Sequence, residues 1–159
     1  MAKVNEFSQR IQMTAHGLQD YMKCLQKITE IPKDTLLEMV DSKAEVTEEA
    51  MVFTAGTELK TGPGGASGGN WGKYYTGDTA RSVRRKRPRM NKRTGPYADI
   101  TFEGTQHGNR NGEVAFVNEY GKKNQPARPF IRHALESSAN ESTTAAAKVL
   151  FDWQKKQGL

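Results

Sequence analysis

The stretch FVNEYGKKNQPARPFIRHALE, residues 116 to 136, decides the fold of this chain. An apolar segment ends in Glu-Tyr-Gly, a polar loop follows, and Pro-Ala-Arg-Pro-Phe leads directly into a helical pattern. Gly121 can take the positive φ that releases a strand into a turn, and Pro126 and Pro129 stiffen the loop and set the start of the helix. The stretch therefore predicts a strand, a stiff loop and a helix in close succession.

The predicted C-terminal helix extends from about residue 129 to 156. Phe130 and Ile131 are expected to hold it on a sheet, whereas Arg128 and Arg132 reach outward. Apolar side chains recur along it at helical spacing, which is typical of a helix with one buried face. That face consists of Ile131, Leu135, Ala139, Ala146, Val149, Leu150 and Trp153.

The N-terminal third is expected to be helical from about residue 5 to 53, with a break at Pro32. Before the break, apolar residues three, four or seven apart predict one helix that ends near residue 29. After it, Thr35 and Glu38 have the T-x-x-E spacing of a capping box. The second helix has a weaker stripe, made of Leu37, Val40, Ala44, Thr47 and Met51.

Residues 56 to 73 are predicted to form a flexible loop, because seven glycines lie between Gly56 and Gly72 and make ordering costly. Trp71 is a candidate anchor for a partner, since an aromatic residue on a mobile loop is a common interface hot spot. A tryptophan folded back on its own core is an equal alternative. Tyr74 and Tyr75 are assigned to the same assembly interface.

Three short segments between residues 80 and 121 are rich in β-branched and aromatic residues, which favour strands. They are SVRRKR at 82 to 87, YADITFEG at 97 to 104 and EVAFVNEYG at 113 to 121. The link QHGNRNG, 106 to 112, is a hairpin-type turn. We expect a small antiparallel sheet of three to four strands.

The predicted fold is α+β, a single domain over residues 1 to 159 in which long N-terminal and C-terminal helices pack on one face of the sheet. The apolar stripes of the helices are one-sided and the strands alternate, which suits such a two-layer arrangement. The residues expected to be deeply buried there are Leu25, Ile28, Leu135, Val149 and Trp153.

Several function classes find no support in the sequence. Cys24 is the only cysteine, so no disulfide can form within the chain, and no apolar run approaches the ~20 residues that span a membrane. The glycine-rich loop fails the phosphate-loop pattern, since Ser67 stands where the first glycine belongs and Tyr74 where a hydroxyl residue binds the metal. The three histidines are scattered. We expect no enzyme activity, no metal, no cofactor, no cleaved signal peptide and no membrane span.

The stretch RSVRRKRPRMNKR, residues 81 to 93, contains eight of the 24 basic residues of the chain and no acid. Without those eight, 16 basic residues would stand against 18 acidic ones, so the net charge of +6 is local. Pro88 argues against a DNA-recognition helix, which leaves non-specific phosphate contact, an acidic protein partner or a solvated surface. The cations are Arg81, Arg84, Arg85, Lys86, Arg87, Arg89, Lys92 and Arg93.

The C-terminal half resembles a family of long-tailed bacteriophage proteins, the tail-completion or minor tail component family of lambda-like phages. The matching segments are the aromatic-Glu-aromatic-Gly-like turn at 116 to 121, the Pro-Ala-Arg-Pro-Phe segment at 125 to 130 and Arg-x-Ala-Leu at 132 to 135. TGDTARSV, 76 to 83, is similar to the family's entry into the first strand, with alanine where leucine is usual and valine for isoleucine. The long glycine loop and the dense basic stretch depart from the family pattern.

The resemblance implies a structural protein of the virion neck that completes the tail and joins it to the head. The chain would form a hexameric or dodecameric ring around the DNA channel, beside head-closure, tail-terminator or tail-tube proteins, after assembly in the host cytoplasm. The basic stretch would face DNA or an acidic neighbouring ring, and the alternative is a non-specific nucleic-acid-binding module. Besides the loop aromatics, the assembly interface would include Glu119, Tyr120, Arg128, Phe130 and Arg132.

Overall fold

The computed structural model describes residues 31 to 60 and 76 to 158. Two long helices, α2 (Lys33–Glu58) and α5 (Phe130–Lys156), enclose a middle region of short elements. That region contains α3 (Asp78–Arg81), β1 (Val83–Arg85), β2 (Arg89–Asn91), β3 (Gly95–Tyr97), β4 (Ile100–Phe102), β5 (Thr105–Gln106), β6 (Asn109–Arg110) and α4 (Asn111–Tyr120). No helix in these two ranges is long and apolar enough to cross a membrane.

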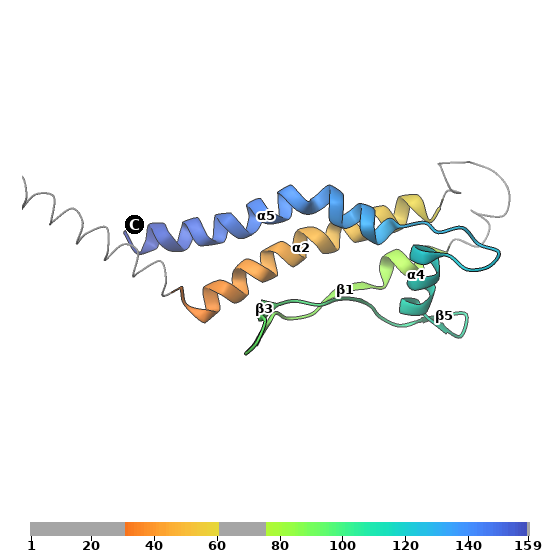
Figure 1. Cartoon of the computed structure of the whole chain (residues 1–159), viewed down its shortest axis with the longest axis horizontal. Coiled ribbons are helices and arrows are strands. Elements are labelled where there is room, and N and C mark those ends of the chain that lie inside the picture. Colours follow the sequence, from red (N-terminus) through yellow and green to blue (C-terminus); the bar gives the residue numbers. More distant parts are fainter. Residues whose placement is uncertain (1–30, 61–75, 159) are drawn as a thin grey trace, which may run out of the picture.

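The fold is α+β, with long helices and small antiparallel sheets of two strands each, β1 with β4, β2 with β3 and β5 with β6. Helix α2 lies between α5 on one side and the strands β1 to β3 on the other (Figure 1). The prediction was a single sheet of three to four strands with both end helices on one face. Its layers are wrong, because α5 packs on α2. The expected helix up to residue 29, with Leu25 and Ile28, lies outside the described residues.

Helix α2 confirms the predicted stripe in part, since Leu37 and Val40 are only half-buried. Ala44, Thr47 and Met51 are buried, and the helix continues five residues past the expected end, through Gly56 to Glu58. The capping box was wrong. The helix begins at Lys33 directly after Pro32, so Thr35 lies inside the first turn, and no side chain caps the helix.

The third predicted strand, 113 to 121, is instead the helix α4. Its buried residues recur at three- and four-residue intervals, as Asn111, Ala115, Asn118 and Glu119, whereas the aromatic Phe116 that favoured a strand is exposed. Tertiary contacts of polar side chains thus outweigh the strand propensity of the apolar ones. The helix ends at Gly121, where φ is +77°, and the turn expected at this glycine is confirmed.

The hairpin turn predicted at 106 to 112 is confirmed in its first half. His107 and Gly108 both have positive φ, 49° and 81°, as the two central residues of a type I′ turn require. Strands β5 and β6 pair across it, Thr105 with Arg110. The second half of the segment was assigned wrongly, because Asn111 and Gly112 begin α4.

The core is centred on Phe130 and Val83, whose side chains are fully buried. The ring of Phe102 meets that of Phe130 edge to face at 6.0 Å. Small side chains let α5 approach α2, and Ser138 satisfies its buried hydroxyl by donating to the carbonyl of Ala134 at 2.7 Å. The buried face of α5 is therefore Phe130, Ala134, Ser138 and Ser142.

This face is rotated from the one predicted. Leu135 is 49% exposed and Ala139 is exposed, whereas Val149 and Trp153 are half-buried and not deeply buried. The start of the helix was predicted to within one residue, at Phe130 with Pro129 before it. Because serine and alanine make up most of the buried stripe, its period was not visible in the apolar residues alone.

Candidate functional site

The basic stretch forms the first arm of a long hairpin, residues 83 to 102, called here the cationic hairpin. Near its base Val83 pairs with Phe102, and near its tip Arg89 pairs with Tyr97. Between the pairs Lys86–Asp99 and Arg89–Tyr97, the first arm has two residues, Arg87 and Pro88, where the second has only Ala98. This two-against-one count is a β-bulge.

The bulge decides which way the cations point. Successive strand residues face opposite sides, and without the bulge Arg89 would share a side with Val83 and Arg85. The extra residue restores Met90 to the half-buried inner side and leaves Arg84, Lys86 and Arg89 on the exposed outer side. The outer face of the cationic hairpin is thus defined by these three cations and by Tyr97, which is 36% exposed.

Among the described residues, Arg85 is the cation of the stretch that forms ion pairs with α2. Its guanidinium forms ion pairs with Asp41, with Glu45 at 3.7 Å and with Glu48 at 3.4 Å, and its side chain is only 22% exposed. The backbone N–H of Arg85 also donates to Glu48 at 2.9 Å. The hydrogen bond to Asp41 raises the pKa of Arg85 above its usual value. This cation therefore holds the hairpin on α2 and is not available to a ligand.

Arg81 is also bound within the chain. It donates to Asp78 at 2.6 Å and to the carbonyl of Thr76 at 2.8 Å. The pKa of Asp78 lies below its usual value because of its hydrogen bond with Thr76 and then that with Arg81. Arg81 remains exposed, but its charge is already balanced by a neighbour.

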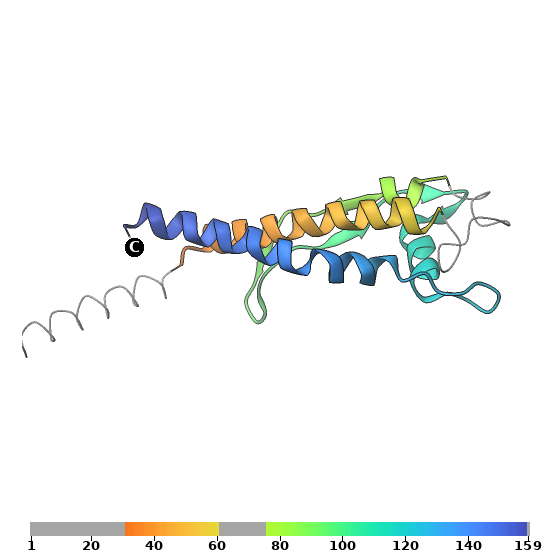
Figure 2. The ribbon, with the colours of Figure 1, turned by 90° about the horizontal axis from the view of Figure 1, so that it is seen from above.

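The other six cations of the stretch are exposed, and none forms an ion pair within the described ranges. At the tip, the side-chain oxygen of Asn91 accepts from the backbone N–H groups of Arg93 and Thr94, and Gly95 takes a φ of +85°. Figure 2 shows this tip projecting from the side of the two long helices. The six are Arg84, Lys86, Arg87, Arg89, Lys92 and Arg93.

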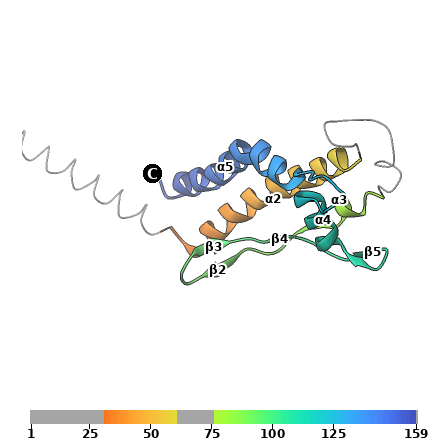
Figure 3. The same cartoon turned by 45° about the vertical axis from the view of Figure 1, so that its right-hand side comes forward.

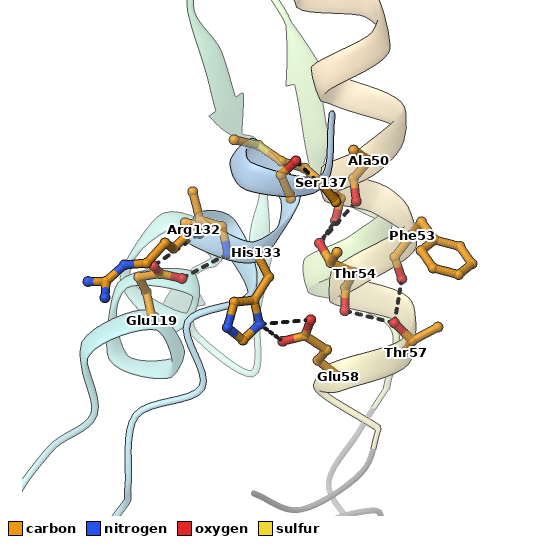
Figure 4. Close-up of polar contacts among 12 residues, drawn as sticks. Ala50, Phe53, Thr54, Thr57, Glu58, Glu119, Arg132, His133 and Ser137 are labelled. Atoms are coloured by element: carbon orange, nitrogen blue, oxygen red, sulfur yellow. Dashed lines mark hydrogen bonds and ion pairs between the residues drawn. The ribbon is translucent and has the colours of Figure 1, made fainter. Parts of the chain in front are cut away.

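The second candidate region is the helix junction, the place where α4, the loop after it and the start of α5 meet the end of α2. Glu119, only 6% exposed, accepts hydrogen bonds from the backbone N–H groups of Ile131 at 2.8 Å and Arg132 at 3.3 Å (Figure 4). A carboxylate at the first turn satisfies N–H groups that have no partner in the helix and complements its dipole. Glu119 therefore caps α5 from another helix.

Arg128 closes the same junction. Its side chain donates to the carbonyl of Leu59 at 3.0 Å and to Asn118, and its backbone N–H donates to the carbonyl of Asn118 at 2.7 Å. Burial lowers the pKa of Arg128. Gly121 allows the loop to pass close by, because a Cβ there would lie 2.8 Å from the backbone of Ala127. Arg128 thus links the ends of three elements and does not reach outward as expected.

Besides Arg128, the residues assigned to the assembly interface fall into three groups. Glu119 and Phe130 lie inside the chain, so they can support an interface only from within. Tyr120 and Arg132 are exposed, and the ring of Tyr120 lies 4.7 Å from that of Phe116. Trp71, Tyr74 and Tyr75 lie outside the described residues, as does most of the loop to which they were assigned.

Sequence reasoning missed the acidic side of the hairpin contact. Asp41, Glu45 and Glu48 have i, i+4, i+7 spacing, which places carboxylates on one side of a helix. That spacing could have indicated an acidic helix face able to pair with the basic stretch at 81 to 93. It also missed Asn118, whose role depends on a helix where a strand was predicted.

A cavity of about 430 Å³ lies beside the helix junction, lined by Leu59, Asn118, Arg128 and parts of α3 and α4. Among the described residues, no three histidine, cysteine or acidic side chains gather as a metal site would need.

No family model, no curated protein and no solved structure matches the chain.

Proposed function

We propose that this chain is a structural protein of the phage neck, which completes the tail and joins it to the head as part of a ring around the DNA channel. The observation that carries the proposal is a contrast between charged residues that are bound within the chain and charged residues that are exposed. Glu119 and Arg128 of the helix junction are bound within the chain, whereas six cations on a projecting hairpin have no acidic partner among the described residues. A rigid scaffold that presents a charged arm suits an assembly component.

The segments that resemble the tail-completion family support the proposal in a specific way. The segment TGDTARSV, 76 to 83, contains α3 and leads into β1, and the residues from Phe116 to Leu135 form the helix junction. Glu119, Gly121 and Arg128 act there on helix ends and on a tight loop. A motif of this kind preserves a scaffold, as expected for a protein whose work is to assemble.

The proposal is tested in the phage that encodes the chain. Particles made without it should show filled heads and separate tails, and supplying the chain in trans should restore joined particles. An electron-microscopy label fused after residue 159 should then appear at the head–tail joint. Normal particles without the chain, or a label elsewhere on the virion, would contradict the proposal.

The second candidate is a non-specific nucleic-acid-binding module, favoured by the six exposed cations of the hairpin. Such contacts need only charge, and typical non-specific dissociation constants are about 10⁻⁴ to 10⁻⁶ M at physiological salt. The two functions separate in a competition experiment with the purified chain. A neck component should bind a neighbouring neck protein better than mixed-sequence duplex DNA, and the reverse order would favour the module.

A further inference from the structure

We propose that the outer face of the cationic hairpin docks on the acidic edge of helix α2 in a second copy of this chain. The inference rests on the proposed ring, for which it names the two surfaces in contact. The first observation is Arg85, a hairpin arginine that forms ion pairs with α2 of its own chain. Asp41, Glu45 and Glu48 surround that one guanidinium.

Helix α2 has more acid than Arg85 can balance. Six of its carboxylates fall within an arc of about 100° around the helix axis. Of these, Asp34, Glu38, Glu45 and Glu49 are exposed, Glu45 with 59% of its side chain in solvent. The acidic edge of α2 is defined by these four residues, and it extends over about 22 Å at 1.5 Å per residue.

The hairpin of the same chain cannot neutralise this edge with the three cations of its outer face. Because Arg85 faces α2, its strand neighbours Arg84 and Lys86 face the opposite way. The bulge at Arg87 and Pro88 keeps Arg89 on that side as well. Figure 3 shows the hairpin running along α2. The outer cations thus need a surface that another molecule supplies.

A second copy supplies one of matching chemistry. The outer face combines three cations with Tyr97, and the acidic edge lies beside Val52, which is 41% exposed. Tyrosine and arginine are enriched in protein interfaces, and complementary charges fix their register. Since the two surfaces differ, the contact is heterologous and runs head to tail, which is the geometry that generates rings.

A charge-swap experiment on the full-length chain tests the inference. The hairpin variant has Arg84→Glu, Lys86→Glu and Arg89→Glu, and the helix variant has Glu38→Lys and Glu49→Lys. Glu45 is left unchanged because it also faces Arg85. The matched controls change the same charge elsewhere, at Lys122→Glu, Lys123→Glu and Lys148→Glu, and at Glu136→Lys and Glu141→Lys, all exposed residues.

Sedimentation velocity measures assembly at about 0.1 M and about 1 M salt. Each variant alone should need about a tenfold or higher concentration to assemble, since like charges would face each other. The controls should assemble like the unchanged chain. An equimolar mixture of the two variants should regain assembly, because every contact in it can pair opposite charges.

Three outcomes would overturn the inference, and they differ in what else they reject. Assembly of the hairpin variant at unchanged concentration rejects the docking surface alone. Loss of assembly that the mixture does not restore rejects the acidic edge as the receiving surface. A chain that stays monomeric under every condition, even beside its neck neighbours, rejects the proposed ring together with the inference.

Discussion

The helix junction and the cationic hairpin use the same charged residue types in opposite ways. In the junction, Glu119 and Arg128 are largely removed from water, and each donates to or accepts from backbone groups of its own chain. On the hairpin, Arg84 and Arg89 are exposed and form no ion pair with the described acids. A buried charge without partners is costly, which accounts for the hydrogen bonds of Glu119 and Arg128 within the chain, whereas the exposed cations of the hairpin carry no such cost.

Arg85 shows the boundary between the two uses. It belongs to the hairpin by sequence, but its ion pairs with α2 make it part of the scaffold. Its neighbour Arg84, one residue earlier, faces solvent. The alternation of the strand thus divides one basic stretch into a structural cation and a set of exposed cations.

Replacing Phe130 with alanine should have the largest effect. The side chain is fully buried, meets Phe102 edge to face and lies in the helix junction. Removing a buried phenylalanine costs about 3 to 5 kcal/mol. Urea unfolding followed by circular dichroism measures the loss. Phe151→Ala is the matched control, because that ring is 64% exposed, and an equal loss in both variants would contradict the assignment of the core.

Gly121→Ala should rank second, at about 3 kcal/mol, since its backbone conformation is one that essentially only glycine adopts. A Cβ would also lie 2.8 Å from the nitrogen of Ala127 and 2.8 Å from the oxygen of Gln125. Gly95→Ala in the hairpin tip has a similar φ but open space around the added carbon, so it should lose only about 1 kcal/mol. Thermal melts of both variants measure the difference, and equal losses would show that strain alone decides.

Glu119→Ala should cost about 2 kcal/mol by removing the cap of α5. Glu113→Ala provides the control, because Glu113 lies in the same helix, is exposed and caps no helix within the described ranges. Hydrogen exchange should then quicken first at the start of α5, near Ile131 and Arg132, whose N–H groups lose their acceptor. Unchanged exchange there would mean that the cap contributes little.

Arg85→Ala should cost about 1 kcal/mol, since its partners are partly exposed and surface ion pairs contribute little. The local effect should be clearer than the global one, with faster hydrogen exchange in β1 and β4 as the hairpin loosens from α2. Lys86→Ala, at the exposed outer neighbour of Arg85, should leave both measurements unchanged. If the two variants behave alike, the inward and outward division of the hairpin is wrong.

The sequence predicted features that depend on local residue patterns and missed features that depend on contacts between distant parts of the chain. The start of α5 at Pro129 and Phe130 and the turn at His107 and Gly108 follow from proline and glycine geometry. The helix at 111 to 120 was missed because its stability comes from polar side chains such as Asn118, which reach other elements. The periodicity of apolar residues does not reveal such contacts. Similarly, the basic stretch is visible in the sequence, but only the bulge at Pro88 shows that Arg89 lies on the same side as Arg84 and Lys86.

The smallest effect on stability should come from neutralising the outer cations, with Arg84→Gln, Lys86→Gln, Arg89→Gln and Arg93→Gln in one variant. Exposed residues of this kind change unfolding free energies by only about 0.5 kcal/mol or less. Any affinity of the chain for duplex DNA should nevertheless become less dependent on salt. The slope of log affinity against log salt should fall by about 0.9 for each phosphate that the variant no longer neutralises. The same measurement with Arg85→Gln should leave the slope unchanged, because that charge is bound to α2. A reduced slope in the Arg85 variant would place its guanidinium on DNA and remove the distinction between the scaffold cation and the exposed cations.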